Sequence, residues 1–465
     1  MSFLVSHSRL FPLVILLLFA CGYVTAVNVS YGIAIIILGL IILLLTTNVK
    51  MFIYSLIIFL SVVGLFSVYL TSIEFSLGTA FQFNALGLLN IGIATVGLGY
   101  IMIKHKKISF KRTKFSKLLI LYLAFSLLTI PFSINLREAL SRWVTIATPI
   151  MVFFIVQNSI RTPIGARKII KLIAIMAMIP MGSGFHQLFT GEGTLYTAGT
   201  DSYRLIGLGG EPNAYAMYLG FLFCLGLSQY VFADSKNRIW WGIYVLSLFV
   251  LIIFTYTRIV WISVIAVITM LLFMQKRWVS LAATLGIVIF LSFTPFIQNR
   301  IGRFSDIIKV VPQLGEKSAV QAGPLNSLTA RSYMWNVTMK NLVLKNGMAF
   351  LIGNGVGSTF AWGKSHPDVL FNWSPHNEYF VTIADTGVIG LLIFLSVFIL
   401  IMKKFIRSYY ASRYPLQKSL CLSSIFLTIS FLLFCLTDNI LGLWSISIFY
   451  WVPIGLAVAV CKEVD

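Results

Sequence analysis

Charged residues are scarce in this sequence. Asp, Glu, Lys and Arg make up 11% of its 465 residues, and 58% are hydrophobic, whereas soluble globular domains are typically about 25% charged. Apolar runs recur from Phe11 to Val460, and most of them are long enough to cross a hydrocarbon core of roughly 30 Å. The sequence therefore excludes a soluble enzyme, and it also excludes a soluble domain on a single membrane anchor.

The apolar runs predict an all-α, polytopic membrane protein with about 14 transmembrane helices. The whole chain, residues 1–465, is expected to form one membrane domain. With boundaries that can shift by about 2–4 residues, we place the spans at residues 10–27, 31–47, 51–73, 84–103, 118–133, 143–158, 172–186, 214–233, 239–255, 259–274, 279–296, 380–402, 419–437 and 440–461.

Acidic residues are rarer than basic ones, at 14 against 35, so the formal net charge is +21. The basic residues lie in short segments between apolar runs and not in a nucleic-acid-binding module, so no nucleic acid partner is expected. If the N-terminus is inside, 23 of the 35 basic residues and 3 of the 14 acidic ones fall on the inner side. The positive-inside rule then predicts that both termini face the cytoplasm.

Motifs for metal ions and nucleotides are missing. The five cysteines have no CxxC spacing and lie in or at the ends of apolar runs, which excludes a disulfide framework and structural zinc. No Walker A lysine, Asp-x-Asp motif or His/Cys cluster occurs, so we predict no cofactor and no metal site. The glycine-rich stretch from Gly353 to Gly357 lacks a phosphate-binding lysine, and we interpret it as a turn.

Two long loops are expected on the outer side, at residues 187–213 and 298–376. Loops of that length usually carry function. In the longer one, residues 300–310 and 327–342 have apolar side chains at helical spacing and predict amphipathic helices.

Four candidate site residues lie on this outer side: Arg204, Arg258, Arg331 and His376. An arginine fork binds phosphate in a bidentate manner and stays charged, and histidine is the usual general base near neutral pH. Each residue also has a structural interpretation, since arginines at span ends anchor to lipid headgroups and a polar residue at a helix start often caps it. We expect the loop ends to bring all four together above one cavity.

The segment around His376 resembles the HN-x9-GxxG signature of the O-antigen polymerase and O-antigen ligase superfamily: His376-Asn377, nine residues, then Gly387-Val-Ile-Gly390. Arg331-Ser-Tyr-Met-Trp335 with the following glycine-rich stretch, Thr257-Arg258, and Arg204 with Pro212-Asn213-Ala214 resemble three looser motifs of the same family. The resemblance covers about residues 200–400.

This resemblance implies a GT-C-like, metal-independent, inverting glycosyltransferase in the bacterial inner membrane, with its active site facing the periplasm. The implied donor is an oligosaccharide linked to undecaprenyl diphosphate. The arginines Arg204, Arg258 and Arg331 would bind the diphosphate, and His376 would activate the acceptor hydroxyl. Glu211, Asn213, Asn377 and Tyr379 are the residues expected to bind or orient the acceptor.

The resemblance leaves polymerase and ligase open. A polymerase transfers the growing chain to another lipid-linked repeat unit, and the span count favours it; a ligase transfers the glycan to lipid A–core.

Membrane lipids and a chain-length regulator protein are further candidate partners. A flippase of the same lipid-linked sugar is a third possibility, but such carriers need charged groups deep in the membrane, and Glu74, Glu138, Asp385 and Asp438 all lie near outer span ends.

Overall fold

The computed structural model describes residues 49–72, 74–77, 81–84, 90, 92–93, 113–160, 162–191, 195–197, 202–208, 211–292, 327–366 and 375–461. The predicted spans at 10–27 and 31–47, most of 84–103 and the predicted helix at 300–310 lie outside these residues.

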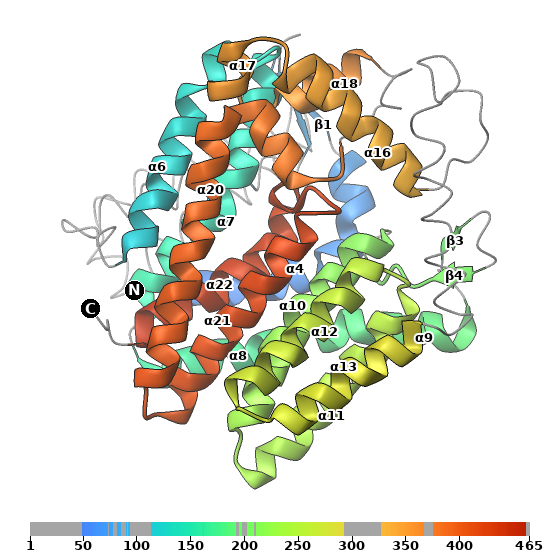
Figure 1. Ribbon diagram of the computed structural model, residues 1–465, viewed down its shortest axis with the longest axis vertical. Coiled ribbons are helices and arrows are strands. Elements are labelled where there is room, and N and C mark those ends of the chain that lie inside the picture. Colours follow the sequence, from blue (N-terminus) through green and yellow to red (C-terminus); the bar gives the residue numbers. More distant parts are fainter. Residues whose placement is uncertain are drawn as a thin grey trace, which may run out of the picture.

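The described residues are mainly helical (Figure 1). The α-helices are α4 (Val49–Ser72), α6 (Lys114–Leu128), α7 (Leu136–Ser159), α8 (Pro163–Met176), α9 (Met178–Thr190), α10 (Pro212–Phe232), α11 (Ser235–Phe254), α12 (Arg258–Met274), α13 (Trp278–Ser292), α16 (Ser327–Thr338), α17 (Gly347–Ile352), α18 (Ser358–Ser365), α20 (Glu378–Ala411), α21 (Pro415–Phe434) and α22 (Trp444–Val460). Short 3-10 helices lie at η1 (Ile130–Phe132) and η4 (Ile440–Gly442), and a π-helical turn lies at η3 (Met339–Val343).

Seven helices among the described residues are long and apolar enough to cross a membrane, counting α8 and α9 as one unit from Pro163 to Thr190. The shorter α12 and α22 are also apolar. The prediction of a polytopic, helical membrane protein is therefore confirmed. Three helices extend well beyond the predicted spans. α7 begins at Leu136 and not at 143, α8 begins at Pro163, where Thr162 caps it, ahead of the span at 172–186, and α20 continues to Ala411, past residue 402.

Two short β-hairpins were not expected. β1 (Glu74–Leu77) pairs with β2 (Phe81–Asn84), and β3 (Leu195–Thr197) pairs with β4 (Ser202–Arg204), both antiparallel. The second hairpin lies in the predicted loop at 187–213, and its last residue is the candidate Arg204. Antiparallel pairing satisfies the backbone groups of a loop that leaves one helix and returns to the next.

The main core is a continuous cluster of buried side chains that reaches from α4 to α22, and a small second cluster joins Leu342, Val343 and Ala384. The most extensive helix contact of the main core joins α7 to α22, where Phe153 packs edge-on against Trp451 at 5.7 Å between ring centroids. Gly455 of α22 lets the two backbones approach, because a Cβ there would lie 3.0 Å from the carbonyl oxygen of Phe153. Close packing over small residues is the main source of helix association in a membrane.

The helix α20 is kinked at Gly387, where φ is +67°. A Cβ at this residue would lie 2.2 Å from the carbonyl oxygen of Leu351 in α17, so only glycine allows this contact. Next to the kink, the carbonyl of Ala384 accepts hydrogen bonds from the backbone and side-chain amides of Asn354, each at 3.0 Å. The first glycine of the GxxG pattern thus allows α17 to pack directly against α20.

The glycine-rich stretch is a turn, as expected, and it binds a carboxylate of α20. Asp385 accepts hydrogen bonds from the Gly357 amide at 2.8 Å and from the amide and hydroxyl of Thr359 at 2.9 and 2.6 Å. Within this turn Gly355 has φ +91° and lies against the backbone of the η1 segment. The turn therefore fixes α18 to α20 and to the start of α7.

Replacing Gly355 with alanine is expected to lower the free energy of unfolding by about 1–3 kcal/mol. The new Cβ would lie 2.4 Å from the Ser133 nitrogen and 2.6 Å from the Thr129 carbonyl oxygen, and neither backbone atom can move aside cheaply. Gly347→Ala is the matched control, because nothing lies within 4 Å of a Cβ there. Thermal unfolding in detergent measures both variants, and equal melting temperatures would contradict the expectation.

Candidate active site

Two segments that are far apart in the sequence lie against each other at one end of the bundle. Residues 375–379 lead into α20, and residues 432–441 end α21 and lead into α22. Because α20 and α21 form an antiparallel pair, the end of α21 returns to the start of α20 (Figure 1). Five hydrogen bonds join the segments apart from any contact of His376: Glu378 N to Cys435 O, Asn377 Nδ2 to Leu436 O, Asn377 N to Asn439 Oδ1, Leu441 N to Glu378 Oε2 and Tyr379 Oη to Leu432 O.

His376 lies at the centre of this junction and contacts Asp438. Its Nδ1 is 3.3 Å from Asp438 Oδ1, and the two side chains are 18% and 7% exposed. The residue has φ +48°, a left-handed conformation that non-glycine residues rarely adopt. With Nδ1–H donating to the carboxylate, the lone pair of the neutral imidazole is on Nε2. The Asp438 contact is the one that favours the tautomer with its lone pair on Nε2.

The helix that follows is capped by Asn377 and not by His376. Asn377 Oδ1 accepts hydrogen bonds from the amides of Tyr379 and Phe380 at 3.0 and 3.2 Å, as N-cap asparagines do. The alternative that His376 caps this span is therefore wrong. The Asn377 amide and the Tyr379 hydroxyl also donate to backbone carbonyls and hold the junction together. That these residues bind or orient an acceptor stays a prediction.

A buried ion pair fixes the start of α20 to α7. Arg142 Nη2 lies 2.5 Å from Glu378 Oε1, and the two side chains are 6% and 1% exposed. The Arg142 guanidinium also stacks over the Phe360 ring at 4.8 Å from its centroid. Since both carboxylate oxygens of Glu378 are bonded, this acid is a structural partner and not a general base.

Replacing Glu378 with alanine is expected to cost roughly 3–5 kcal/mol of stability, because it leaves the Arg142 charge buried and unpaired. Glu138→Ala is the control, since the Lys364–Glu138 pair has side chains that are 62% and 24% exposed and surface pairs contribute about 0–1 kcal/mol. Thermal unfolding in detergent measures the difference in stability. Equal losses of stability in both variants would show that the buried ion pair contributes no more than the exposed one.

Arg331 lies on α16, which is anchored directly to the His376 segment. One turn after Arg331, Trp335 Nε1 donates to the carbonyl of Pro375 at 2.7 Å, and its ring stacks on Phe380 at 5.4 Å. Residues four apart share a face of a helix, so this anchor brings Arg331 to the same junction. Burial lowers the pKa of Arg331, while the charges of Asp438 and Glu211 act in the opposite direction.

Arg204 lies at the end of β4 and is held by the turn between α11 and α12. Its Nε donates to the Thr255 carbonyl, and its Nη2 donates to Asn213 Oδ1 and Thr257 Oγ1, each at 2.9 Å. Asn213, in the first turn of α10, therefore positions Arg204. Arg258 follows Thr257 directly and begins α12 at this same end of the bundle.

Glu211 interacts electrostatically with the charged groups of the other site segments. It is the N-cap residue of α10 and is exposed, yet the surrounding protein atoms still desolvate its carboxylate. This desolvation and the charge of Asp438 raise its pKa, against the opposing effects of His376, Arg204 and Arg331. Glu211 is therefore within electrostatic reach of all four groups.

The structure thus places Arg204, Arg331, His376 and Glu211 around one site, and Arg258 at the same end. The contacts made by Asp438, Arg142 and Thr257 were not predicted from the sequence. A signal for Asp438 exists: it follows α21, and two antiparallel spans after His376 bring the chain back to the same end of the bundle. The Arg142–Glu378 contact joins residues 236 positions apart and leaves no such signal.

A comparison with protein families matches residues 243–395 to the O-antigen ligase family. This stretch is similar to the O-antigen ligase family. The resemblance to the O-antigen polymerase and ligase superfamily is thereby confirmed for this stretch, and members of the family are glycosyltransferase-like enzymes. No curated protein matches the chain at a significant level.

The matched O-antigen ligase stretch runs from α11 into α20, past the kink at Gly387. It contains Arg258, Arg331 and His376, whereas Arg204, Glu211 and Asp438 lie outside it. The candidate site therefore combines residues from the matched domain with residues from the flanking helices.

Proposed function

We propose that this chain transfers an oligosaccharide from undecaprenyl diphosphate to a sugar hydroxyl on the periplasmic face of the bacterial inner membrane. The observation that carries the proposal is the His376–Asp438 contact, with Arg331 within electrostatic reach of Asp438 and Arg204 within electrostatic reach of Glu211. A general base beside cationic side chains is the arrangement that displacement of a diphosphate by a hydroxyl requires. The span count of about 14 and the GT-C-like fold belong to this proposal.

In the proposed reaction the acceptor oxygen attacks the anomeric carbon, and the bond from that carbon to the diphosphate oxygen breaks. The proton of the acceptor hydroxyl passes to His376 Nε2, and the Asp438 carboxylate stabilises the resulting imidazolium. The electron pair of the broken bond stays on the diphosphate, whose charge Arg204, Arg258 and Arg331 neutralise. A single displacement of this kind inverts the anomeric configuration.

The polymerase form of the reaction uses a second lipid-linked repeat unit as the acceptor, and we favour it from the predicted span count. The ligase form, with lipid A–core as the acceptor, is the second candidate because the matched family is described as O-antigen ligase. The two differ in their products, since a polymerase gives a ladder of chain lengths and a ligase gives one product per donor.

Purified full-length protein in liposomes, supplied with lipid-linked repeat units and no ion gradient, tests the proposal. A ladder of longer lipid-linked chains would support polymerase activity. Product that forms only after lipid A–core is added would support the ligase. Movement of the substrate across the membrane without any new glycosidic bond would contradict both and favour a flippase.

Replacing Arg331 with alanine is expected to lower activity at least tenfold, because loss of a charge contact in a partly desolvated site costs roughly 2–4 kcal/mol of transition-state stabilisation. Lysine should rescue only part of the activity, since it lacks the planar fork. Lys340→Ala, an exposed residue in the π-helical turn after α16, is the control. Wild-type activity of folded Arg331→Ala would remove this residue from the site.

A further inference from the structure

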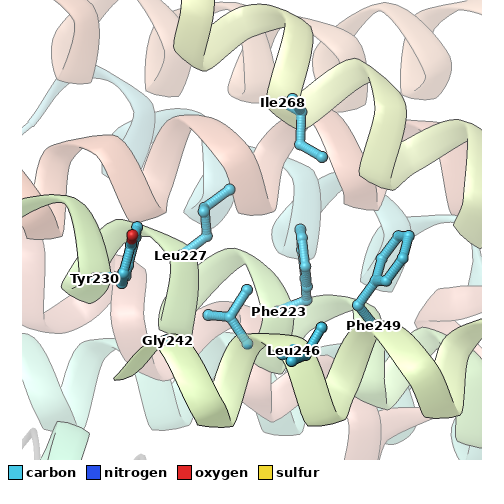
Figure 2. Close-up of a pocket in the computed structure, with 8 residues that line it drawn as sticks. Phe223, Leu227, Tyr230, Gly242, Leu246, Phe249 and Ile268 are labelled. Atoms are coloured by element: carbon cyan, nitrogen blue, oxygen red, sulfur yellow. The ribbon is translucent and has the colours of Figure 1, made fainter. Parts of the chain in front are cut away.

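An apolar groove lies between α10, α11 and α12, toward the end of these helices that is opposite the candidate active site. Its volume is about 350 Å³. Figure 2 shows Phe223, Leu227 and Tyr230 from α10, Gly242, Leu246 and Phe249 from α11, and Ile268 reaching in from α12. The only side-chain polar group among these residues is the Tyr230 hydroxyl, at one end of the groove. Both α10 and α11 are candidate membrane spans, so an acyl chain suits this surface.

Gly242 helps to form the hollow. A Cβ at this residue would meet the Tyr230 ring at 3.4 Å, which is an ordinary contact, so a larger side chain would project toward the groove without a backbone clash. The surrounding part of α11 has few protein neighbours, since Trp240, Ile243 and Leu246 are 69%, 52% and 62% exposed. A bound chain would therefore cover apolar surface that the protein leaves open.

The end of the groove is basic. The guanidinium of Arg238 lies over the Tyr230 ring, 5.0 Å from its centroid. Arg167 and Lys236 lie within electrostatic reach of Asp234, which caps α11 beside Arg238. Three cations and one carboxylate thus gather where the apolar lining stops, and this charge is complementary to an anionic headgroup.

We propose that the groove binds one acyl chain of an anionic phospholipid whose phosphate contacts Arg238. The polyprenyl donor is a poorer fit, because its diphosphate would be at the opposite ends of α10 and α11. The 20 residues of α11 separate the two ends, and a helix of that length spans roughly 30 Å.

The bound lipid would also support the α11–α12 hairpin. This hairpin has few contacts on its outer side, and its far end carries the Thr255 carbonyl and Thr257 hydroxyl that hold Arg204. An occupied groove therefore stabilises the element that positions an arginine of the candidate active site.

Native mass spectrometry of the delipidated full-length protein, titrated with phosphatidylglycerol and phosphatidylcholine of matched chains, tests the proposal. We expect the wild type to bind phosphatidylglycerol about fivefold more tightly, since one basic contact contributes about that factor. Gly242→Leu should lose the binding of both lipids, whereas Gly286→Leu, which adds the same bulk where nothing lies within 4 Å of the new Cβ, should retain it.

The headgroup contact is tested separately with an exposed residue whose replacement does not disturb the core. Arg238→Gln should bind the two lipids equally, and Arg277→Gln, an exposed arginine at the same end of the bundle, should keep the preference. Equal affinity of the wild type for both lipids would overturn the proposal, and so would equal binding by the two glycine variants. Displacement of phosphatidylglycerol from the wild type by undecaprenyl diphosphate, together with loss of undecaprenyl diphosphate binding in Gly242→Leu, would assign the groove to the donor chain instead.

Discussion

Replacing His376 with alanine is expected to reduce turnover by about 10²–10⁴-fold, the usual contribution of a general base, with donor binding and the melting temperature near those of the wild type. The proposed reason is that Nδ1, 3.3 Å from Asp438 Oδ1, donates to this carboxylate, so that Nε2 takes the acceptor proton. The effect should appear in kcat, since the proton moves only during the chemical step.

Initial rates with lipid-linked repeat units measure this effect, and donor binding is measured by isothermal titration. His366→Ala is the matched control, because His366 is an exposed histidine at the end of α18 that stacks on Trp362. His376→Gln keeps the size and polarity of the side chain but cannot accept the proton as a base. If His376→Gln retains most of the rate at neutral pH, the base assignment is wrong, and Glu211 is the next residue to test.

Replacing Asp438 with asparagine is expected to have the second-largest effect, a loss in kcat of about 10²–10⁴-fold with little change in donor affinity. Its Oδ1 accepts from His376 Nδ1 and from the Asn439 amide, and Oδ2 is buried without a hydrogen-bond partner among the described residues. An uncharged amide can no longer stabilise an imidazolium. By donating to Nδ1, it would also place the ring proton on Nε2 and remove the lone pair that accepts the acceptor proton.

The Asp438→Asn variant separates positioning from simple structural support. If Asp438 has only a structural role, the variant should have a lower melting temperature and no selective effect on kcat over KM. If Asp438 positions His376, the loss should be confined to kcat. Asp234→Asn is the control, because asparagine caps a helix as well as aspartate does and Asp234 lies at the opposite end of α10 and α11. Wild-type kcat in folded Asp438→Asn would contradict the proposed role.

The amino-acid sequence by itself determined the class of protein and most of the described helices, and it predicted several residues of the candidate site. Long apolar runs leave few alternatives, because backbone groups in a bilayer must be satisfied within helices or closed barrels. The turn at 353–357, the helix from 327 and the Thr257-Arg258 position between two spans also followed from local patterns, since glycine content, caps and helical spacing act over a few residues. The two β-hairpins did not follow, because strands of three or four residues have too little alternation to be recognised.

Only the tertiary structure decided which polar groups meet. Asp438 is 62 residues from His376, and Arg142 is 236 residues from Glu378, so neither contact is encoded in a local pattern. These contacts also give three adjacent polar residues different roles. His376 contacts the Asp438 carboxylate, Asn377 caps α20 and Glu378 is buried in an ion pair. The physical reason is that a polar side chain in a low-dielectric interior takes its role from the partner that the packing of distant helices brings to it.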